Sequence, residues 1–417
     1  MFGSNAGSVR TVPTTAPEFA NAPSPGRLFR MQPLAPSTPG YDIAAFRRQI
    51  PLLESVIPMN NCSQAPQTTG TRAAAERYLE SWNRHGMDWD AWIGEVQLAK
   101  VEFARLIGAS TDEIALFSSV SEATSAVASA LDFSGRRRNV VVTEAEFPTV
   151  GHVWLAQERR GARLRWVPVR DGAVDPRAYE PHVDRDTLII SACHGYYVDG
   201  ATQDIARIAA QAHEVDALLF VDAYQTLGAV PVDVKAMGVD FLVSGNLKYL
   251  MGVPGVAFLY VQRELIEGLH PTMTGWFGRA DPFAFRVNEL DWSHTASRFD
   301  SGTPPVINVY IARAGMELIN EIGVRSIRAW HEVLAQRLID GGRARGLTLF
   351  GPCDVMAKTA STAFVVRDSP AVESAMRARG VLPSARGPVI RLAPHYYSTL
   401  DDVDTALDVL ALVSAGT

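Results

Sequence analysis

Seven short runs rich in aliphatic and β-branched residues constrain the fold of this 417-residue chain more than any other feature. The runs are IALFS (114–118), NVVVT (139–143), RLRWVPV (163–169), TLIISA (187–192), ALLFVD (217–222), DFLVS (240–244) and GVAFLYV (255–261). Apolar strands that alternate with helix-length segments such as SEATSAVASALDF are typical of a βαβ array, with helices on both faces of the sheet. We therefore predict an α/β fold with a mostly parallel, seven-stranded sheet, and ligands at the carboxyl ends of its strands.

The first 40 residues differ in composition from the rest of the chain. They are rich in Pro, Ser, Ala and Thr and poor in large aliphatics, so they cannot offset the entropy of folding by themselves. We expect a flexible arm over residues 1–40. A weaker interpretation is an organelle transit peptide, because Glu18 is the only acid among several arginines, but an amphipathic period is missing.

The pattern changes again after Pro304. The sequence there predicts long helices at about 305–322 and 325–343, short strands near Leu347 and Phe364, a helix at 370–379 and a closing helix from Asp401. This order is typical of a smaller α+β domain. We expect a large domain at 41–304, whose segment 41–70 contributes to the small domain or the pocket, and a small C-terminal domain at 305–417.

Composition and charge narrow the class of partner. The chain has 39 basic and 45 acidic residues, a formal charge of −6, and no basic tail, so nothing recruits nucleic acid or an anionic membrane. No apolar run approaches a bilayer span. The three cysteines lie far apart, which suggests neither disulfides nor a metal site and fits a reducing compartment. We expect a cytoplasmic protein that binds a small molecule.

Two charged residues near the ends of neighbouring predicted strands carry the chemistry. Asp222 ends a very apolar strand, where an ionised carboxylate is costly without a cationic partner. A protonated pyridine nitrogen is such a partner. Lys248 follows the next strand in a glycine-rich loop, and a lysine in a confined site can lose its proton and form a Schiff base with an aldehyde. Together the two residues indicate a site for pyridoxal 5′-phosphate (PLP).

The segments VDAYQ, SGNLK and GVPGVAFLYV resemble the aminotransferase class V group of fold-type I PLP enzymes, which includes cysteine desulfurases, selenocysteine lyase, kynureninase and related C–S lyases. The resemblance runs from about Asn60 to about Val413. It implies that Asp222 pairs with the pyridine nitrogen and that Gln225 bonds the phenolic oxygen of the cofactor. It makes Lys248 the catalytic lysine that binds PLP.

The same resemblance implies further cofactor contacts. Ser119, Val120 and Ser121 align with the segment that opens the phosphate-binding helix, although an N-cap serine is also an ordinary structural feature. Phe147 aligns with the aromatic residue that stacks on the cofactor ring, and without that alignment it would be taken for core. Tyr197 lies where the family places a residue near the phenolic oxygen.

Two residues are expected to act across a dimer interface. RFDSGTP resembles the F-x-x-GTP segment of the family, whose threonine reaches the phosphate of the neighbouring subunit, and this assigns Thr303. Trp276, in GWFG, is a second candidate, as in the kynureninase branch, or else an interface or core residue. The resemblance therefore implies a homodimer with the active site at the interface.

An α-amino acid substrate needs a clamp for its carboxylate, and a bidentate guanidinium suits that role. VIRLAPHYY matches the segment that holds the family's carboxylate-binding arginine, which assigns Arg391. Arg386 could assist or be a solvated loop residue. Asn61, in NNCSQAP, resembles a residue that lines the substrate pocket. His194 is a candidate proton carrier, with a buried, satisfied histidine as the alternative.

The sequence also departs from the family. The segment LPSARGPVIR lacks the persulfide-forming cysteine of desulfurases, and Leu247 stands where relatives have His or Tyr before the lysine. Ser244 and Asn246 are the remaining cofactor contacts predicted in this loop. We expect β-elimination from an S-substituted cysteine-like amino acid, a C–S lyase reaction. The alternatives are an aminotransferase, oxidative decarboxylation-deamination, epimerisation, kynureninase-type hydrolysis, or a degenerate homologue without cofactor.

Overall fold

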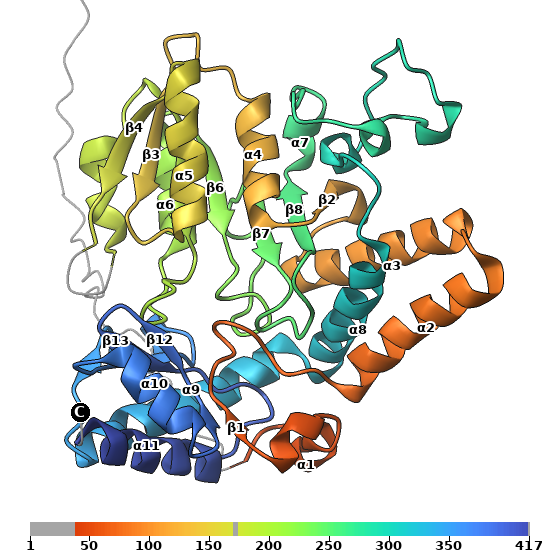
Figure 1. Ribbon diagram of the computed structural model, residues 1–417. Coiled ribbons are helices and arrows are strands. Elements are labelled where there is room, and N and C mark those ends of the chain that lie inside the picture. Colours follow the sequence, from red (N-terminus) through yellow and green to blue (C-terminus); the bar gives the residue numbers. More distant parts are fainter. Residues whose placement is uncertain (1–37, 170–173, 416–417) are drawn as a thin grey trace, which may run out of the picture. The chain divides into compact units, whose positions relative to one another are not determined.

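The computed structural model describes residues 38–169 and 174–415 (Figure 1). The predicted N-terminal arm lies almost entirely outside these residues. All seven predicted strands belong to one sheet. Their bounds are Ile114–Phe117 (β2), Asn139–Thr143 (β3), Arg163–Val167 (β4), Thr187–Cys193 (β5), Leu218–Asp222 (β6), Phe241–Gly245 (β7) and Ala257–Val261 (β8).

The strand order in this large sheet is β2-β8-β7-β6-β5-β3-β4. Strands β3 to β7 pair in parallel, and β8 runs antiparallel to both β7 and β2. The prediction of a mostly parallel sheet is therefore confirmed. Because only β8 runs in the opposite direction, the other six strands end at the same edge, and the loops that follow them meet there.

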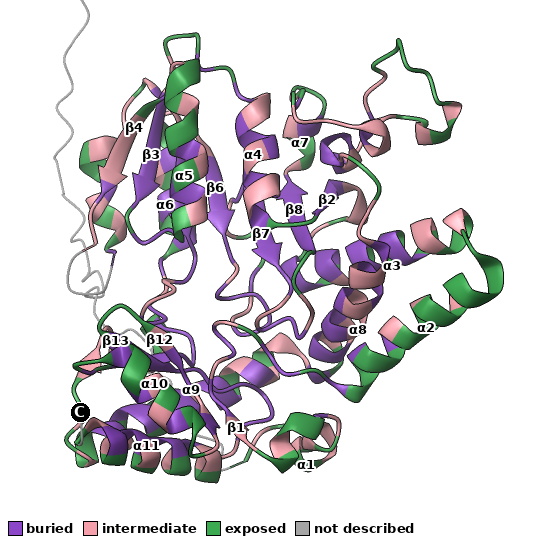
Figure 2. Cartoon of the chain, viewed as in Figure 1, coloured by how far each residue is buried: buried purple, intermediate pink, exposed green. Residues whose placement is uncertain are grey.

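Helices cover both faces of the large sheet, most of whose strands are buried (Figure 2). Alternate strand residues enter two cores, one on each face. In β6, Leu219 and Val221 belong to one core and Phe220 to the other, as the period of two requires. Each such side chain contributes about 1.5–3 kcal/mol on full burial. The first core includes α3 (Trp89–Ile107), α6 (Ile205–Glu214) and α8 (Val306–Ile322); the second includes α4 (Val120–Ala130) and α5 (Pro148–Ala156).

The helix that follows Pro304 packs on helices from the start of the described chain. Helix α8 contacts both α3 and α2 (Thr69–His85). Two further helices are short, α1 (Ile43–Arg47) and α7 (Arg263–Ile266). The domain boundary at 304 stays a prediction. Among the described residues, none of the helices combines the length and the apolar character needed to cross a membrane.

The C-terminal part contains a four-stranded antiparallel sheet of order β12-β13-β10-β9, against which helices pack. Its elements are α9 (Val324–Ala344), β9 (Leu349–Phe350), β10 (Thr362–Val365), α10 (Ser369–Arg377), β12 (Ser384–Arg386), β13 (Val389–Leu392) and α11 (Leu400–Ser414). The early segment β1 (Ile57–Pro58) pairs in parallel with β11 (Val381–Leu382), and Met59 enters the core of this part. The segment 41–70 thus contributes a strand and a core residue to the C-terminal part.

Candidate active site

The loops that follow the parallel strands meet at the carboxyl edge of the large sheet (Figure 1). Most of the predicted cofactor residues lie in these loops or at the strand ends. Ser119 follows β2, Phe147 follows β3 and Tyr197 follows β5. Asp222 is the last residue of β6, and Lys248 lies in the loop after β7. Parallel strands place these five residues at one edge of the sheet, in the last residue of β6 or in the loops after the other strands, and the ligand site at this edge stays a prediction.

Lys248 is the central residue of this edge. Its Nζ lies 4.1 Å from the ring centroid of Tyr224 and 5.8 Å from that of Phe147. Burial lowers the pKa of the lysine to about 8, although the nearby Asp222 carboxylate favours the charged form. At neutral pH, a usable fraction of such an amine is therefore unprotonated, as a nucleophile that attacks an aldehyde requires.

Asp222 is buried, and its Oδ1 accepts a hydrogen bond from the main-chain N of Tyr224 at 2.8 Å. Burial raises the pKa of the carboxyl, while the Tyr224 hydrogen bond and the charge of Lys248 lower it. Gln225, also buried, donates from Nε2 to the main-chain oxygen of Cys62 at 3.1 Å. This bond ties the Asp222 loop to the NNCSQAP segment.

His194 lies beside Asp222 in the backbone, since its main-chain N donates to the oxygen of Asp222 at 2.8 Å. The imidazole is buried, and burial lowers its pKa to about 4. It is therefore neutral at neutral pH. Its Nδ1 has no hydrogen-bond partner among the described residues, so the alternative of a satisfied histidine does not hold, and the role of His194 as a proton carrier stays a prediction.

The start of α4 is open to solvent. Ser119 is the N-cap, and its Oγ accepts from the main-chain N of Glu122 at 3.2 Å; the side chain is exposed. Ser121 shares a 2.6 Å hydrogen bond with Thr149 on α5, so the first turns of the two helices are joined. Val120, the first helical residue, is buried. The capping role is thus realised, and the helix N-terminus remains available to an anion such as a phosphate.

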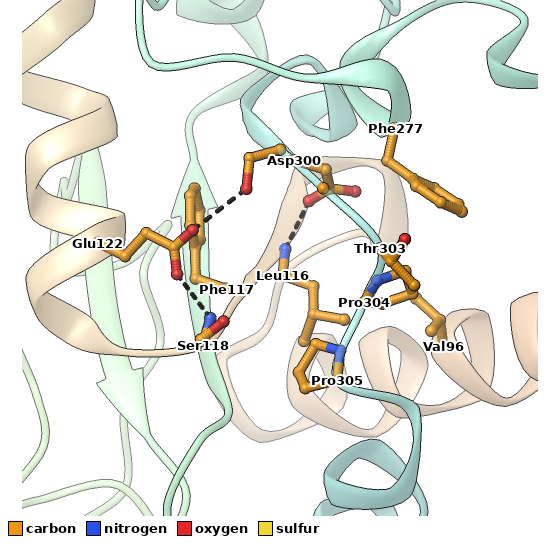
Figure 3. A pocket seen from close by; sticks show the side chains of 12 residues that line it. Val96, Leu116, Phe117, Ser118, Glu122, Phe277, Asp300, Thr303, Pro304 and Pro305 are labelled. Atoms are coloured by element: carbon orange, nitrogen blue, oxygen red, sulfur yellow. Dashed lines mark hydrogen bonds between the residues drawn. The ribbon is translucent and has the colours of Figure 1, made fainter. Parts of the chain in front are cut away.

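Thr303 lines a pocket with Ser118, Glu122 and Phe277 (Figure 3). The Glu122 carboxylate accepts from the main-chain N of Ser118 at 3.0 Å and from Ser301 Oγ at 3.1 Å. These two bonds hold the SGTP segment beside the start of α4. The expected action of Thr303 on a neighbouring subunit stays a prediction.

Trp276 belongs to an aromatic cluster at the start of α3. Its ring lies edge-on to Trp89 at a centroid distance of 5.5 Å and stacks on Phe285 at 6.0 Å. Phe277 and Phe283 complete the cluster. The structure therefore places Trp276 with these rings and not with Lys248 or Asp222 of the same chain.

Arg391, on β13, is buried, and its guanidinium contacts only neutral acceptors. It donates to the main-chain oxygen of Tyr197 at 2.6 Å, to Ser63 Oγ at 3.0 Å and to Ser384 Oγ at 2.5 Å. No carboxylate of the described residues forms an ion pair with it. A buried cation without a counter-ion is costly, so the arrangement favours an anionic ligand.

Three other predicted residues, Asn61, Arg386 and Ser244, have different surroundings. Both ends of the Asn61 amide are engaged within the protein, by Ala393 O and the Tyr397 hydroxyl, each at 2.8 Å. Asn61 therefore anchors its segment to the C-terminal sheet. Arg386 is exposed on β12, yet it helps to lower the pKa of Lys248. Ser244 Oγ donates to Gly245 O at 2.9 Å.

Asn246 provides a direct test of whether PLP fits this site. Its side chain is fully buried, and neither amide atom has a hydrogen-bond partner among the described residues. A buried amide normally has partners, so a polar ligand is indicated. The buried Asp222 for the pyridinium, the Lys248 amine for the aldehyde and the open start of α4 for the phosphate complete a donor set that fits the cofactor.

Sequence reasoning missed four residues of this site. Tyr224 follows Asp222 closely in VDAYQ, so the motif itself contained the signal. Ser63 and Ser384 converge on Arg391 from distant segments, and no local pattern indicates them. Glu146 precedes Phe147 and accepts from Ser191 Oγ at 2.8 Å; burial and Asp222 raise its pKa well above the usual range.

Comparisons with known proteins agree with this geometry. A family model described as aminotransferase class-V matches residues 68–381. An uncharacterized aminotransferase, YcbU, of Bacillus subtilis (strain 168) is 37% identical over 368 residues, 88% of this chain and 96% of that protein. A probable cysteine desulfurase of Methanothermobacter thermautotrophicus is 31% identical over 290 residues, 68% and 71% respectively. Kynureninase of Pseudomonas fluorescens is 27% identical over 394 residues, 88% and 91%.

Solved structures share the fold. The apo cysteine desulfurase from Thermococcus onnurineus NA1 has a TM-score of 0.81 at 21% identity, covering 90% of this chain and 98% of that one. The cystine C–S lyase C-DES, in complex with cysteine persulfide, has a TM-score of 0.79 at 18% identity, covering 87% and 99%. This chain therefore belongs to the aminotransferase class V family. It is a PLP-dependent enzyme of fold-type I, as the motifs predicted.

Proposed function

We propose that this enzyme acts on an α-amino acid and catalyses β-elimination from an S-substituted cysteine-like substrate. The observation that carries the proposal is the buried guanidinium of Arg391, which has only neutral partners and affects the pKa of Lys248. An α-carboxylate at Arg391 would bring Cα of the same amino acid toward the lysine amine.

PLP supplies an electron-accepting ring that stabilises the negative charge left at Cα when a proton is removed. Asp222 keeps the ring nitrogen protonated, because a buried carboxylate favours a cation beside it. Lys248 Nζ takes the proton from Cα, and the electron pair left behind expels the thiolate at Cβ. The ammonium of Lys248 then returns a proton to the departing sulfur.

The net reaction consumes one water. An S-substituted cysteine and water yield a thiol, pyruvate and ammonium, and neither an oxidant nor a reductant is required. Residues 382–390, before Arg391, contain no cysteine to receive a sulfur atom, which supports direct elimination over transfer of sulfur to the protein. Cys62 and Cys193 are buried, and Cys353 is exposed elsewhere. Direct release of the thiol needs none of them.

A class V aminotransferase is the second candidate. The observation that favours it is the 37% identity, over 88% of this chain, to a protein named an uncharacterized aminotransferase. Both reactions begin with removal of the Cα proton by Lys248, so the residues described above serve either one. They differ in the next bond that changes, which depends on the leaving group at Cβ and on an amino-group acceptor.

Mass spectrometry of products from the PLP-loaded enzyme, given S-substituted cysteines with and without a keto acid, separates the two. We expect pyruvate and free thiol in the absence of the acceptor. A new amino acid that appears only with the acceptor would contradict the lyase proposal and support the aminotransferase. Alanine, carbon dioxide or an inverted amino acid as product would instead indicate hydrolysis, decarboxylation or epimerisation.

We also propose that the enzyme is a cytoplasmic homodimer in which Thr303 and Trp276 act across the interface. The aromatic side chains around Trp276 support an interface there, since Phe285 is 73% and Phe283 40% exposed. The free state of all three cysteines fits a reducing compartment.

A further inference from the structure

The amine of Lys248 lacks the polar partners that the other lysines of this chain have. Lys100 Nζ donates to Asp300 at 2.8 Å, Lys235 contacts Glu113, and Lys358 donates to Thr362 at 3.1 Å. Among the described residues, no hydrogen bond or ion pair reaches Lys248 Nζ. Two aromatic faces lie beside this amine.

That face belongs to Tyr224, whose ring centroid lies 4.1 Å from Lys248 Nζ. A lysine ammonium within about 6 Å of a ring centroid is attracted by the negative face of the ring. The second ring, that of Phe147, is more distant at 5.8 Å. The contact with Tyr224 is therefore the closer of the two cation–π contacts.

The position of the Tyr224 ring is fixed by the backbone around it. Its main-chain N donates to Asp222 Oδ1 at 2.8 Å. The ring packs on Gly245, at the end of β7, so tightly that a Cβ there would lie 2.1 Å from the Tyr224 Cζ. Any larger residue at 245 would displace the ring, so glycine is required at this position.

The surroundings of Lys248 favour its charged and its neutral form to a similar extent. Asp222 and Cys62 favour the ammonium, whereas burial, Arg391 and Arg386 oppose it, with the result that its pKa lies at about 8. A group in this condition responds to one added or removed contact by a shift of its pKa across the physiological range.

We propose that Tyr224 is a positioning residue that holds the ammonium form of Lys248 against its ring and thereby sets the pH at which this amine becomes a base. The inference rests on the proposed role of Lys248 in moving the Cα proton. When Nζ has accepted that proton from Cα, the ring face stabilises the new positive charge until the proton passes to the departing group. The more strongly the ring stabilises the ammonium form, the stronger a base the Lys248 amine is, and the higher the pH at which it titrates.

Competitive acetylation of the full-length apo protein with trace acetic anhydride tests this inference without any turnover. Peptide mass spectrometry across a pH series gives the titration midpoint of Lys248, with Lys235 as the internal reference. The variants are Tyr224→Phe, which keeps the ring face, and Tyr224→Leu, which removes it. A third protein carries pentafluorophenylalanine at position 224, which keeps the shape of the ring but withdraws electrons from its face.

We expect the titration midpoint of Lys248 in Tyr224→Phe to equal that in the wild type. In the leucine and pentafluorophenylalanine proteins this midpoint should lie about 0.5–1.5 pH units lower. A Lys248 midpoint that is the same in all four proteins would overturn the inference, as would a shift in Tyr224→Phe equal to that in Tyr224→Leu. If Tyr224→Leu fails to fold, the pentafluorophenylalanine protein alone tests the inference, because it keeps the shape of the ring.

A separate measurement tests the proposed function on which this inference depends. PLP and borohydride are added to the same wild-type protein, and the mass of the Lys248 peptide is measured. A reduced PLP adduct on Lys248 is expected. If PLP attaches elsewhere, the proposed role of Lys248 fails whatever the titrations show; if it attaches at Lys248 and the midpoints coincide, only the role of Tyr224 fails.

Discussion

Arg391 carries a buried charge that the described part of the chain does not neutralise, and this makes its substitution informative at the scale of a single residue. Its three neutral partners, Tyr197 O, Ser63 and Ser384, orient the guanidinium without balancing it. We predict that Arg391→Lys lowers kcat/KM for an α-amino acid by about 10- to 100-fold, as expected for loss of a charge-assisted hydrogen bond worth roughly 1.5–3 kcal/mol.

The decisive measurement is discrimination between two ligands. Binding of an amino acid and of the amine that lacks its carboxylate is followed through the absorbance of the bound cofactor. Wild-type protein should prefer the amino acid, and Arg391→Lys should lose most of that preference. The exposed Arg379, changed to Lys, serves as the matched control. Equal preference in the wild type and Arg391→Lys would remove Arg391 from the carboxylate site.

At the scale of elements, a buried ion pair connects α3, β2 and the segment that holds Thr303. Lys100 Nζ, on α3, lies 2.8 Å from Asp300 Oδ2, and Asp300 Oδ1 accepts from the main-chain N of Leu116 at 2.7 Å. Ser301, the next residue, bonds Glu122 on α4. The pair therefore fixes the pocket of Figure 3 as well as the packing of α3.

We predict that Asp300→Asn, which keeps an acceptor for Leu116 but leaves Lys100 buried and unpaired, lowers the free energy of unfolding by about 3–5 kcal/mol. Adding Lys100→Met should restore part of that loss, because the uncompensated charge is then removed. Urea denaturation measures both effects. In the exposed pair of Arg72 and Glu76, Glu76→Gln should change stability by less than about 0.5 kcal/mol. If Asp300→Asn also lowered the free energy of unfolding by less than about 0.5 kcal/mol, the prediction would be contradicted.

The elements also show where prediction from sequence succeeds. Strands such as β3 and β6 were predicted nearly to their ends, because buried parallel strands are continuous runs of β-branched and aliphatic residues. Strands β1, β11, β12 and β13 were missed, since two to four residues are too few to show a period. These short strands exist because of their tertiary pairing.

In the candidate site, too, some residues could be predicted from local sequence patterns, whereas others depend on the tertiary fold of the whole molecule. Asp222 and Lys248 were predictable because their motifs lie at the ends of adjacent strands of one βαβ array. The surroundings of Arg391 were not, since Ser63, Ser384 and Tyr197 come from three separate segments that meet only in the folded chain. The local pattern thus indicates the proposed reacting groups, whereas the contacts around them depend on the tertiary fold.

Two buried histidines connect the Lys248 loop with the C-terminal part and make global stability depend on pH. His395 Nδ1 lies 3.4 Å from His331 Nε2, and His395 Nε2 lies 3.1 Å from the oxygen of Tyr249, the residue after Lys248. Burial lowers the pKa of His395 to about 3 and that of His331 well below its usual range. Both rings are neutral in the folded protein at neutral pH.

We predict that His395→Gln is less stable than the wild type near pH 7.5 and that this deficit shrinks as the pH falls. Between an unfolded pKa of about 6.5 and the folded value of about 3, the unfolded wild type binds one more proton at this residue, so folding loses stability at His395 as the pH falls. The glutamine variant does not lose this stability, because glutamine does not bind a proton in this pH range. The deficit should therefore decrease by about 2 kcal/mol between about pH 7.5 and about pH 5.

Urea denaturation of wild type and variant at each pH measures the difference directly. Comparison at equal pH is essential, because the pKa of the buried Asp199 is raised to about 7 by burial, and a carboxyl with a raised pKa adds stability as the pH falls. That contribution is common to both proteins and cancels. The exposed His152→Gln is the control for replacing a histidine by glutamine. A pH-independent deficit in His395→Gln would show that His395 is protonated equally in the folded and unfolded chains, against the burial that isolates it from water.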